Sequence, residues 1–313
     1  MATSIPGSDS AEDPAARAVT RPARASRAMP SAAGRRGGLR ALRRFARRRI
    51  VLVGCVLVAL EVGLAAGAPL LSSHDPNAQD FRAALGPPGW THLLGTDDLG
   101  RDLLSRLMHG ARLSLQVSVA AVALAVGVGV LLGLVSGYLG GPLDNWMMRV
   151  VDSLMALPPL VLALLIAAVL GAGLENAMIA IAVVTAPTYT RLMRGQVLAV
   201  KQNEYVVAAR ASGAAVSRIL GRHVLPNSVS PIIVQASLGV GAAIITESSL
   251  SFIGLGAQPP VATWGSMIQV GFQYLETAPW FVLAPSVMIF LAVLGFNLLG
   301  DGLRDAFDPS LRP

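Results

Sequence analysis

Long apolar runs separated by polar segments dominate the sequence after residue 49. The first run, Ile50–Leu71, has about the 20 apolar residues that an α-helix needs to cross a bilayer. Soluble domains interrupt such runs, because their helices and strands keep one polar face. The pattern therefore predicts an all-α membrane protein with about six transmembrane helices in residues 50–313. The expected spans lie near residues 50–71, 115–134, 154–170, 177–190, 231–246 and 280–299.

The composition supports a membrane domain and separates it from the start of the chain. Hydrophobic residues make up 53% of the 313 residues and charged residues 14%, which is more apolar than one soluble core can bury. Residues 1–38 are rich in Ala, Ser, Gly, Pro and Arg, and we expect them to form a disordered basic tail. Residues 39–49 add a basic segment, expected in the cytosol. We expect no nucleic-acid partner, because 12 of the 25 Lys and Arg residues precede Ile50 and fit a topology-setting role.

A secretory signal is the alternative interpretation of this basic segment and the apolar run that follows it. Ala66-Gly67-Ala68 resembles a signal-peptidase site. The run and its leader are longer than those of a signal peptide, so we expect an uncleaved anchor helix. The only cysteine, Cys55, lies in this run, so the chain can form no internal disulfide.

Basic residues alternate between the two sides of the predicted bundle. The segment 191–230 contains six of them, whereas 250–279 contains none. Because Lys and Arg favour the cytosolic side, both termini and the 191–230 segment are predicted to be cytosolic. The outer segment 76–114 includes an amphipathic stretch, residues 102–108, that we expect to lie along the membrane interface.

The cytosolic segment contains a predicted amphipathic helix outside the membrane. Apolar side chains recur at helical spacing from Glu204 to Leu220. Gly213 permits a bend, and Pro226 is expected to stop the helix before the fifth span. Small residues around Ala208 allow another protein surface to approach closely. The alternative is a connector that packs only against its own bundle.

The spacing in this segment resembles the signature of permease subunits of ABC importers. That signature runs Glu-Ala-Ala, three residues, Gly, nine residues, Ile, any residue and Leu-Pro. Here Val207-Ala208-Ala209 occupies the triplet, Gly213 follows, and His223-Val224-Leu225-Pro226 ends the motif. Val207 and His223 depart from the pattern. A His before Val-Leu-Pro is familiar in the peptide and nickel branch of the family. Val207 stands where the signature has Glu, but Glu204 lies one helical turn earlier.

Two further stretches resemble the same branch, and the resemblance extends over nearly everything after Ile50. They are His92–Arg106 and Glu247–Gly256, the latter followed by Pro259-Pro260 and Thr263-Trp264-Gly265. The resemblance implies the type I ABC importer permease fold, with a cytosolic coupling helix in the loop 191–230 that docks into a separate ATPase subunit. The residues implied in coupling are Glu204, Val207, Ala208, Ala209, Arg210, Gly213, His223, Leu225 and Pro226.

The resemblance also implies partners and a cargo. The expected partners are a second, related permease, one or two ATP-binding subunits and an extracytoplasmic peptide-binding protein in a bacterial cytoplasmic membrane. ATP and magnesium are expected on the partners, because the only lysine, Lys201, lies outside any Gly-Lys-Ser/Thr phosphate-binding loop. We expect no catalytic residue and no cofactor in this chain. Dipeptides or short oligopeptides are the expected cargo, with nickel, glutathione and other small solutes left open.

Ionisable residues inside apolar spans are costly and suggest function. Glu61 is expected to be neutral or hydrogen-bonded within the bundle, and Glu247 to line the path or to face the interface. Glycines of the second span, Gly127, Gly129, Gly133 and Gly137, are expected to serve helix packing. The polar residues expected along the translocation path are Thr185, Tyr189, Gln235, Thr246 and Glu247.

The sequence offers little support for an ion-coupled transporter, a membrane enzyme or a metal site. An ion-coupled secondary transporter needs carboxylates at mid-membrane, and only Glu61 fits that requirement. A membrane enzyme needs an acid-base cluster. The closest candidates, without catalytic spacing, are Asp97, Asp98, Arg101, Asp102 and His109. No metal site is predicted, because the four histidines are scattered along the chain.

Overall fold

A computed structural model describes residues 49–307, so the predicted tail 1–38 and most of the basic segment 39–49 lie outside its range. The described part contains no strand, only an isolated bridge between Thr96 and Asp102. The α-helices are α2 (Arg49–Leu71), α3 (Leu103–Leu139), α4 (Gly141–Met155), α5 (Pro159–Leu170), α6 (Leu174–Val200), α7 (Glu204–Ala211), α8 (Val216–Ile219), α9 (Leu225–Phe252), α10 (Trp264–Gly271) and α11 (Trp280–Phe307). Short turns of other helix types are η2 (Phe81–Ala83), η3 (Leu220–Val224) and η4 (Phe272–Tyr274).

Among the described residues, four continuous helical segments are long and apolar enough to cross a membrane. They are Ile50–Leu71, Leu103–Leu139, Val216–Phe252 and Trp280–Phe307. The helices α4 and α5, which meet at a bend of 93°, make a fifth candidate as a pair. The remaining long helix, α6, has 27 residues, and its threonines and arginines lower its mean hydropathy. The all-helical membrane fold is therefore confirmed.

The second membrane helix begins before the expected span. Helix α3 starts at Leu103 rather than near residue 115, and the Asp102 carboxylate caps it by accepting the Ser105 N–H at 2.8 Å. Leu103 and Leu107 are buried. The expectation that residues 102–108 lie along the membrane interface is wrong, because this amphipathic turn packs into the protein interior.

The fifth span also begins earlier than its apolar run. Helix α8 continues through the π-helical turn η3 into α9, and Pro226 lies in the first turn of α9. In that π turn the Leu225 N–H donates to the Leu220 carbonyl, five residues back. The expectation that Pro226 ends the preceding helix is therefore wrong. The bulge lets the chain stay helical around a residue that has no N–H to donate.

Glycines bring α3 and α6 into close contact. A Cβ atom added at Gly129 would lie 2.6 Å from the Tyr189 Cβ, and one at Gly133 would lie 2.6 Å from the Thr190 carbonyl oxygen. One added at Gly137 would lie 2.9 Å from the Val197 Cβ. The packing role predicted for these three glycines is confirmed. Gly127 differs, because nothing approaches its added Cβ within 4 Å.

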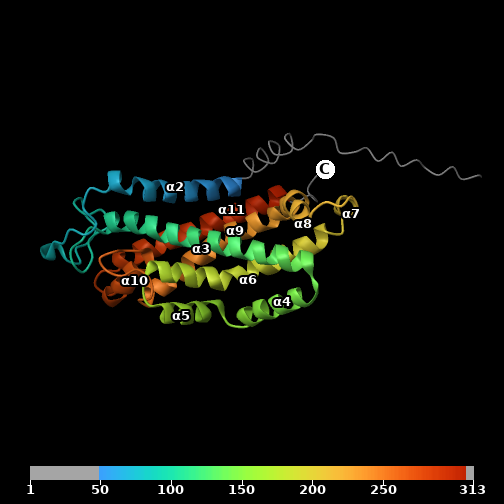
Figure 1. The fold of residues 1–313 in the computed structure, drawn as a ribbon. Helices are drawn as coiled ribbons and strands as arrows, with labels where there is room; N and C mark the ends of the chain where they lie inside the picture. The colour runs from blue at the N-terminus through green and yellow to red at the C-terminus, as the bar shows by residue number, and fades with distance from the viewer. Residues whose placement is uncertain (1–48, 308–313) are drawn as a thin grey trace, which may run out of the picture. The chain divides into compact units, whose positions relative to one another are not determined.

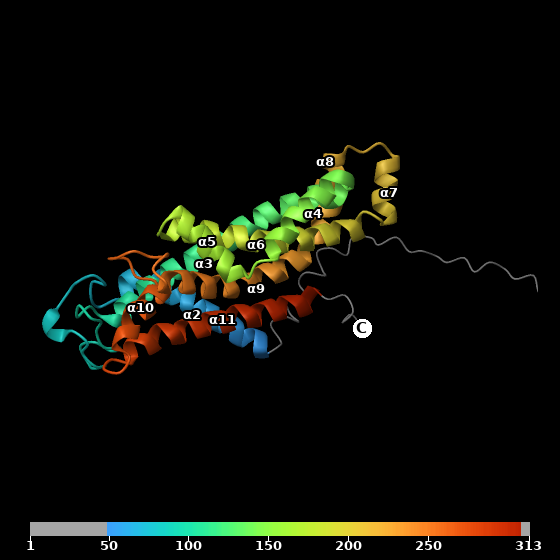
Figure 2. The same cartoon turned by 90° about the horizontal axis from the view of Figure 1, so that it is seen from below.

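The long helices run between two ends of the bundle (Figures 1 and 2). Helices α7 and α8 lie at one end, called here the α7 end, while α10 and the segment 72–102, called the loop cap, lie at the other (Figure 2). Helices α2 and α11 are antiparallel, because a Cβ added at Gly54 meets Leu298 and one added at Gly295 meets Val58. The start of α2 and the end of α11 consequently face the α7 end.

Glu61 of α2 is a buried carboxyl without a partner. It is 2% exposed, and neither carboxyl oxygen has a hydrogen-bond partner in the described part of the chain. We expect Glu61→Met to stabilise the isolated chain by about 1–3 kcal/mol, because it removes an unsatisfied polar group. The unfolding midpoint in detergent, followed by tryptophan fluorescence, should rise. The control Glu61→Gln should change it less, and a midpoint lowered by Glu61→Met would contradict this account.

Candidate coupling surface and polar cap

Helix α7 presents an exposed apolar surface at the α7 end. Val206 is fully buried and Ile219 is 1% exposed, so these two side chains fix the segment to the bundle. Their neighbours face outward, and Val207, Tyr205 and Val216 are 44–53% exposed. An outward apolar surface made of small and β-branched residues is suited to contact with another protein.

The predicted helix 204–220 is interrupted at the glycine expected to permit a bend. Helix α7 ends at Ala211, and Gly213 adopts φ +74°, a left-handed conformation that favours glycine. The Gly213 N–H donates to the Arg210 carbonyl at 3.0 Å, closing the turn. The bend is confirmed, and it separates α7 from α8.

Three contacts connect α7 and its approach to the long helices. The Arg210 guanidinium lies 5.6 Å from the centre of the Tyr138 ring near the end of α3. The ring centres of Tyr205 and His223 are 6.2 Å apart, which joins α7 to η3. Lys201 Nζ donates to the Gly137 carbonyl at 2.7 Å. These contacts join α7 and the turn before it to α3 and to the helix that continues into α9.

The expected coupling residues gather at this end, on α7 and around η3. They differ in exposure: Ala209, His223 and Leu225 are partly buried, whereas Glu204, Val207, Ala208, Arg210, Gly213 and Pro226 are exposed. Ala209 packs against the core. The outward face of α7 is therefore carried by Val207 and Ala208.

An ion pair fixes the corner next to this surface. Arg194 of α6 donates to both carboxylate oxygens of Asp144 of α4, from Nε at 2.6 Å and from Nη2 at 2.7 Å. The Ser136 hydroxyl of α3 also donates to Asp144. The Asp144 carboxylate therefore joins α3, α4 and α6 near the α7 end.

Among the described residues, those expected along the path line neither the apolar groove between α3 and α9 nor the pocket around Gly173. Thr185 and Thr246 donate to carbonyls of their own helices, Ile181 and Ala242, at 2.8 and 2.9 Å. The Tyr189 hydroxyl reaches the Gln235 carbonyl at 3.4 Å. The exposed fractions also differ, since Tyr189 is buried whereas Thr185, Gln235 and Thr246 are partly exposed. The assignment of these five residues to the path thus stays a prediction.

Glu247 lies at a hydrogen-bonded junction inside the protein. It is fully buried, so it does not face the membrane interface. Ser251 donates to its carboxylate at 2.8 Å, and the Ser248 hydroxyl is 3.5 Å away. Nearby, the Trp264 N–H donates to the Ser114 hydroxyl at 3.3 Å. Thr263 beside α10 and Ser114 of α3 also hydrogen-bond to the Glu247 carboxyl, which therefore contributes to the contact between α9, α10 and α3.

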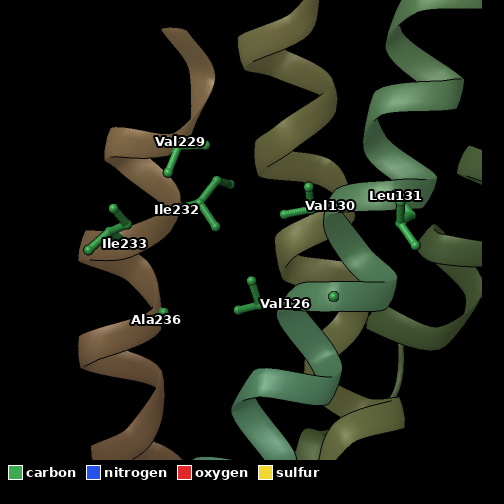
Figure 3. Close-up of a pocket in the computed structure, with 8 residues that line it drawn as sticks. Val126, Val130, Leu131, Val229, Ile232, Ile233 and Ala236 are labelled. Atoms are coloured by element: carbon green, nitrogen blue, oxygen red, sulfur yellow. The ribbon is translucent and has the colours of Figure 1, made fainter. Parts of the chain in front are cut away.

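An apolar groove of about 490 Å³ lies between α3 and α9. Figure 3 shows Ile232 of α9 pointing towards Val126 and Val130 of α3 across it. The lining residues are Val126, Gly127, Val130, Leu131, Val229, Ile232, Ile233 and Ala236. None of the expected path residues lines the groove. Its chemistry suits a hydrocarbon chain or an apolar helix better than a peptide.

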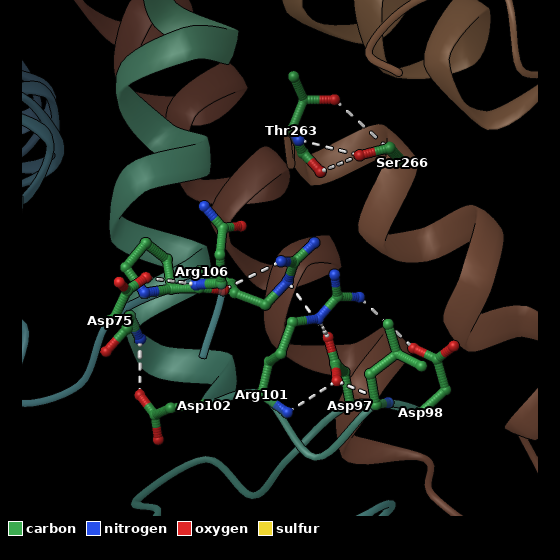
Figure 4. A network of polar contacts seen from close by, with 12 residues as sticks. Asp75, Asp97, Asp98, Arg101, Asp102, Arg106, Thr263 and Ser266 are labelled. Atoms are coloured by element: carbon green, nitrogen blue, oxygen red, sulfur yellow. Dashed lines mark hydrogen bonds and ion pairs between the residues drawn. The ribbon is translucent and has the colours of Figure 1, made fainter. Parts of the chain in front are cut away.

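A buried polar network organises the loop cap (Figure 4). The Asp97 carboxylate is fully buried and accepts the Arg101 Nε–H at 2.6 Å. It also accepts the backbone N–H groups of Leu99 and Arg101 at 2.9 Å, and Arg106 Nε lies 3.3 Å away. Arg106 donates further to the Pro76 carbonyl at 3.1 Å. These residues, which sequence reasoning considered as an acid-base cluster, fix the loop cap onto α3.

The pKa values of two aspartates of the loop cap, Asp98 and Asp102, are shifted in opposite directions. Burial and the neighbouring Asp97 carboxylate raise the pKa of Asp98, although Arg101 opposes the shift. Burial also disfavours the Asp102 carboxylate. Hydrogen bonds from Ser105 and His92 outweigh that effect, so the pKa of Asp102 is lowered. Asp102 therefore stays ionised beside His92.

The structure is a helical membrane bundle with an exposed apolar face on α7 at one end and a buried polar network at the other. The chain belongs to the family described as binding-protein-dependent transport system inner membrane component, which matches residues 129–313. Residues 39–88 match the N-terminal TM domain of oligopeptide transport permease C. The chain is a multi-pass inner-membrane permease of an ABC importer with the type I fold. It is non-catalytic, works with a binding protein, and relies on separate subunits for ATP hydrolysis.

Curated relatives cover most of the chain. The dipeptide transport system permease protein DppC of Alkalihalophilus pseudofirmus is 44% identical over 87% of this chain and 90% of that protein. The probable D,D-dipeptide transport system permease protein DdpC of Escherichia coli is 45% identical, covering 83% and 87%. The glutathione transport system permease protein GsiD of Pectobacterium atrosepticum is 43% identical, covering 86% and 90%. A solved chain of the inward-facing MetNI methionine ABC transporter aligns at 19% identity, with a TM-score of 0.49, over 65% of this chain and 97% of that chain.

Proposed function

We propose that this permease moves dipeptides or short oligopeptides into the cell. The observation that carries the coupling role is the outward apolar face of α7, linked to α3 and α9 through Arg210 and Tyr205. The peptide cargo is supported by the names of relatives at 44% and 45% identity. Glutathione, itself a small peptide, is the second candidate, because a glutathione permease is similar over the same share of the chain.

In this proposal the α7 end faces the cytosol and contacts the ATPase. Val207 and Ala208 fill an apolar cleft of that subunit, while Gly213 sets the angle at which α7 projects. Arg210 and His223 transmit the displacement to α3 and α9. ATP and magnesium bind to the ATPase subunits. The loop cap faces the opposite side and receives the peptide-binding protein.

A second, related permease completes the conduit in this proposal. The apolar groove between α3 and α9 suits a helix of that partner, because its lining offers no polar group to a peptide. Partly exposed polar residues such as Thr185 and Gln235 then line a path shared by the two subunits. Buried Glu247 supports the path wall through Ser251 rather than binding an ion.

Uptake into proteoliposomes tests the proposal. The chain is reconstituted with its second permease, its ATPase subunits and its binding protein, and internal ATP drives uptake of labelled dipeptides, tripeptides, glutathione or Ni²⁺ supplied separately. We expect ATP-dependent uptake of dipeptides and tripeptides that requires the binding protein. Uptake of glutathione or Ni²⁺ alone would overturn the peptide cargo while leaving the importer class intact. Uptake that needs an ion gradient instead of ATP would overturn the proposed mechanism.

A further inference from the structure

Three side chains with metal-binding atoms meet at the loop cap, far from the coupling surface. His74 follows α2, His92 lies in the cap, and Asp102 precedes α3. One ligand atom of each lies within 4.8 Å of those of the other two. The His74 and His92 rings are 4.9 Å apart and tilted by 35°. Two imidazoles and a carboxylate form a donor set that binds Zn²⁺ and related ions.

Asp102 is held in place as a ligand by the fold. Its side chain is 4% exposed, and its Oδ2 atom accepts the Ser105 N–H at 2.8 Å as the cap of α3. Its Oδ1 atom faces His92 Nδ1 at 2.9 Å. The hydrogen bond from Ser105 orients the carboxylate, and an ion bound at Oδ1 would replace the hydrogen bond of that oxygen with His92 Nδ1.

The three ligand atoms have to move slightly closer together to share one ion. Two ligands on one zinc ion lie at most about 4.2 Å apart, because each metal–ligand distance is about 2.1 Å. His74 is exposed and lies in the segment after α2, where its Nδ1 contacts the neighbouring Ser73 hydroxyl at 3.0 Å. Its exposure leaves this side chain room to move towards His92 and Asp102.

We propose that His74, His92 and Asp102 form a binding site for one first-row divalent cation such as Zn²⁺, with water completing the coordination. The ion would connect the end of α2 to the start of α3, across a cap whose other contacts come from Asp97 and Arg106. It would therefore stabilise the cap in one arrangement. This inference concerns a site separate from the coupling surface and does not depend on the peptide cargo.

Cobalt binding tests the site directly. The full-length chain, purified in detergent without a histidine tag, is titrated with Co²⁺, whose visible absorption reports nitrogen and oxygen ligands, and then with Zn²⁺ as competitor. We expect one ion per chain. His74→Ala, His92→Ala and Asp102→Asn should each weaken binding by about tenfold or more. Asn at position 102 keeps an oxygen to cap α3, which protects the fold of that variant.

His109→Ala is the matched control, because His109 lies on α3 with its ring against the Ser105 carbonyl, outside the cluster. It should bind Co²⁺ like the wild type. Zn²⁺ should also raise the unfolding midpoint of the wild type and of His109→Ala, but not of His74→Ala. Absence of stoichiometric Co²⁺ binding by the wild type would overturn the proposal. Wild-type affinity in His74→Ala, whose exposed side chain is dispensable for folding, would overturn it equally.

Discussion

Val207→Asp is expected to reduce ATP-dependent uptake by about tenfold or more while the chain still inserts normally. Val207 is 53% exposed on the outward face of α7, so the change should lower the stability of the isolated subunit only slightly. Docking would bury the new carboxylate against an apolar surface. Loss of a central interface anchor costs about 2 kcal/mol or more, and about 1.4 kcal/mol already corresponds to tenfold in affinity. Uptake in proteoliposomes and co-purification of the ATPase subunit measure the effect.

Val207→Leu is the matched control, because it keeps an apolar side chain at the same position. It should retain uptake and co-purification of the ATPase. Ala209→Glu is a poorer test, since Ala209 packs against the core and a charge there would also damage the bundle. Wild-type uptake by Val207→Asp would contradict the docking role of α7. An equal loss in Val207→Leu would point to shape rather than charge.

The apolar runs predicted the membrane helices better than they predicted where those helices begin and end. An apolar run shows which residues can lie in the hydrocarbon core of the membrane. A helix, in contrast, extends as far as its backbone N–H and C=O groups find hydrogen-bond partners. Helix α3 therefore begins at Leu103, where Asp102 supplies a cap, before its apolar run. Helix α6 extends to Val200 past two arginines, because Arg194 is neutralised by Asp144 from α4. Neither partner is visible from hydropathy.

Helix α7 and the bend that follows it were predictable because their information is local. Signature spacing and helical periodicity both identified residues 204–226, and Gly213 indicated the bend. The contacts that connect the segment to the bundle were not predictable. Arg210 meets Tyr138, and Tyr205 meets His223, through folding rather than sequence proximity. The cluster of His74, His92 and Asp102 was missed for the same reason, because a search for helical ligand spacing cannot find residues that loops bring together.

Gly133→Val is expected to destabilise the bundle strongly and to lower the amount of chain in the membrane. A Cβ at this position would lie 2.6 Å from the Thr190 carbonyl oxygen and 2.7 Å from the Met193 Cβ, so α3 and α6 would have to separate. Overpacking against a flexible side chain costs about 1–3 kcal/mol. Because the nearest atom here belongs to the backbone, we expect a loss of about 3 kcal/mol. The unfolding midpoint of the isolated chain in detergent measures it.

Gly127→Val separates this contact from the general effect of replacing glycine in a helix. Gly127 lies on the same helix, and nothing approaches its added Cβ within 4 Å, so the same substitution should leave the midpoint of the isolated chain nearly unchanged. Similar losses in both variants would show that helix propensity, rather than contact with α6, sets the stability. Gly127 lines the apolar groove. If Gly127→Val alone prevented assembly with the second permease, the groove would be the contact with that subunit. The α3–α6 contact at Gly133 would then serve the stability of the single chain.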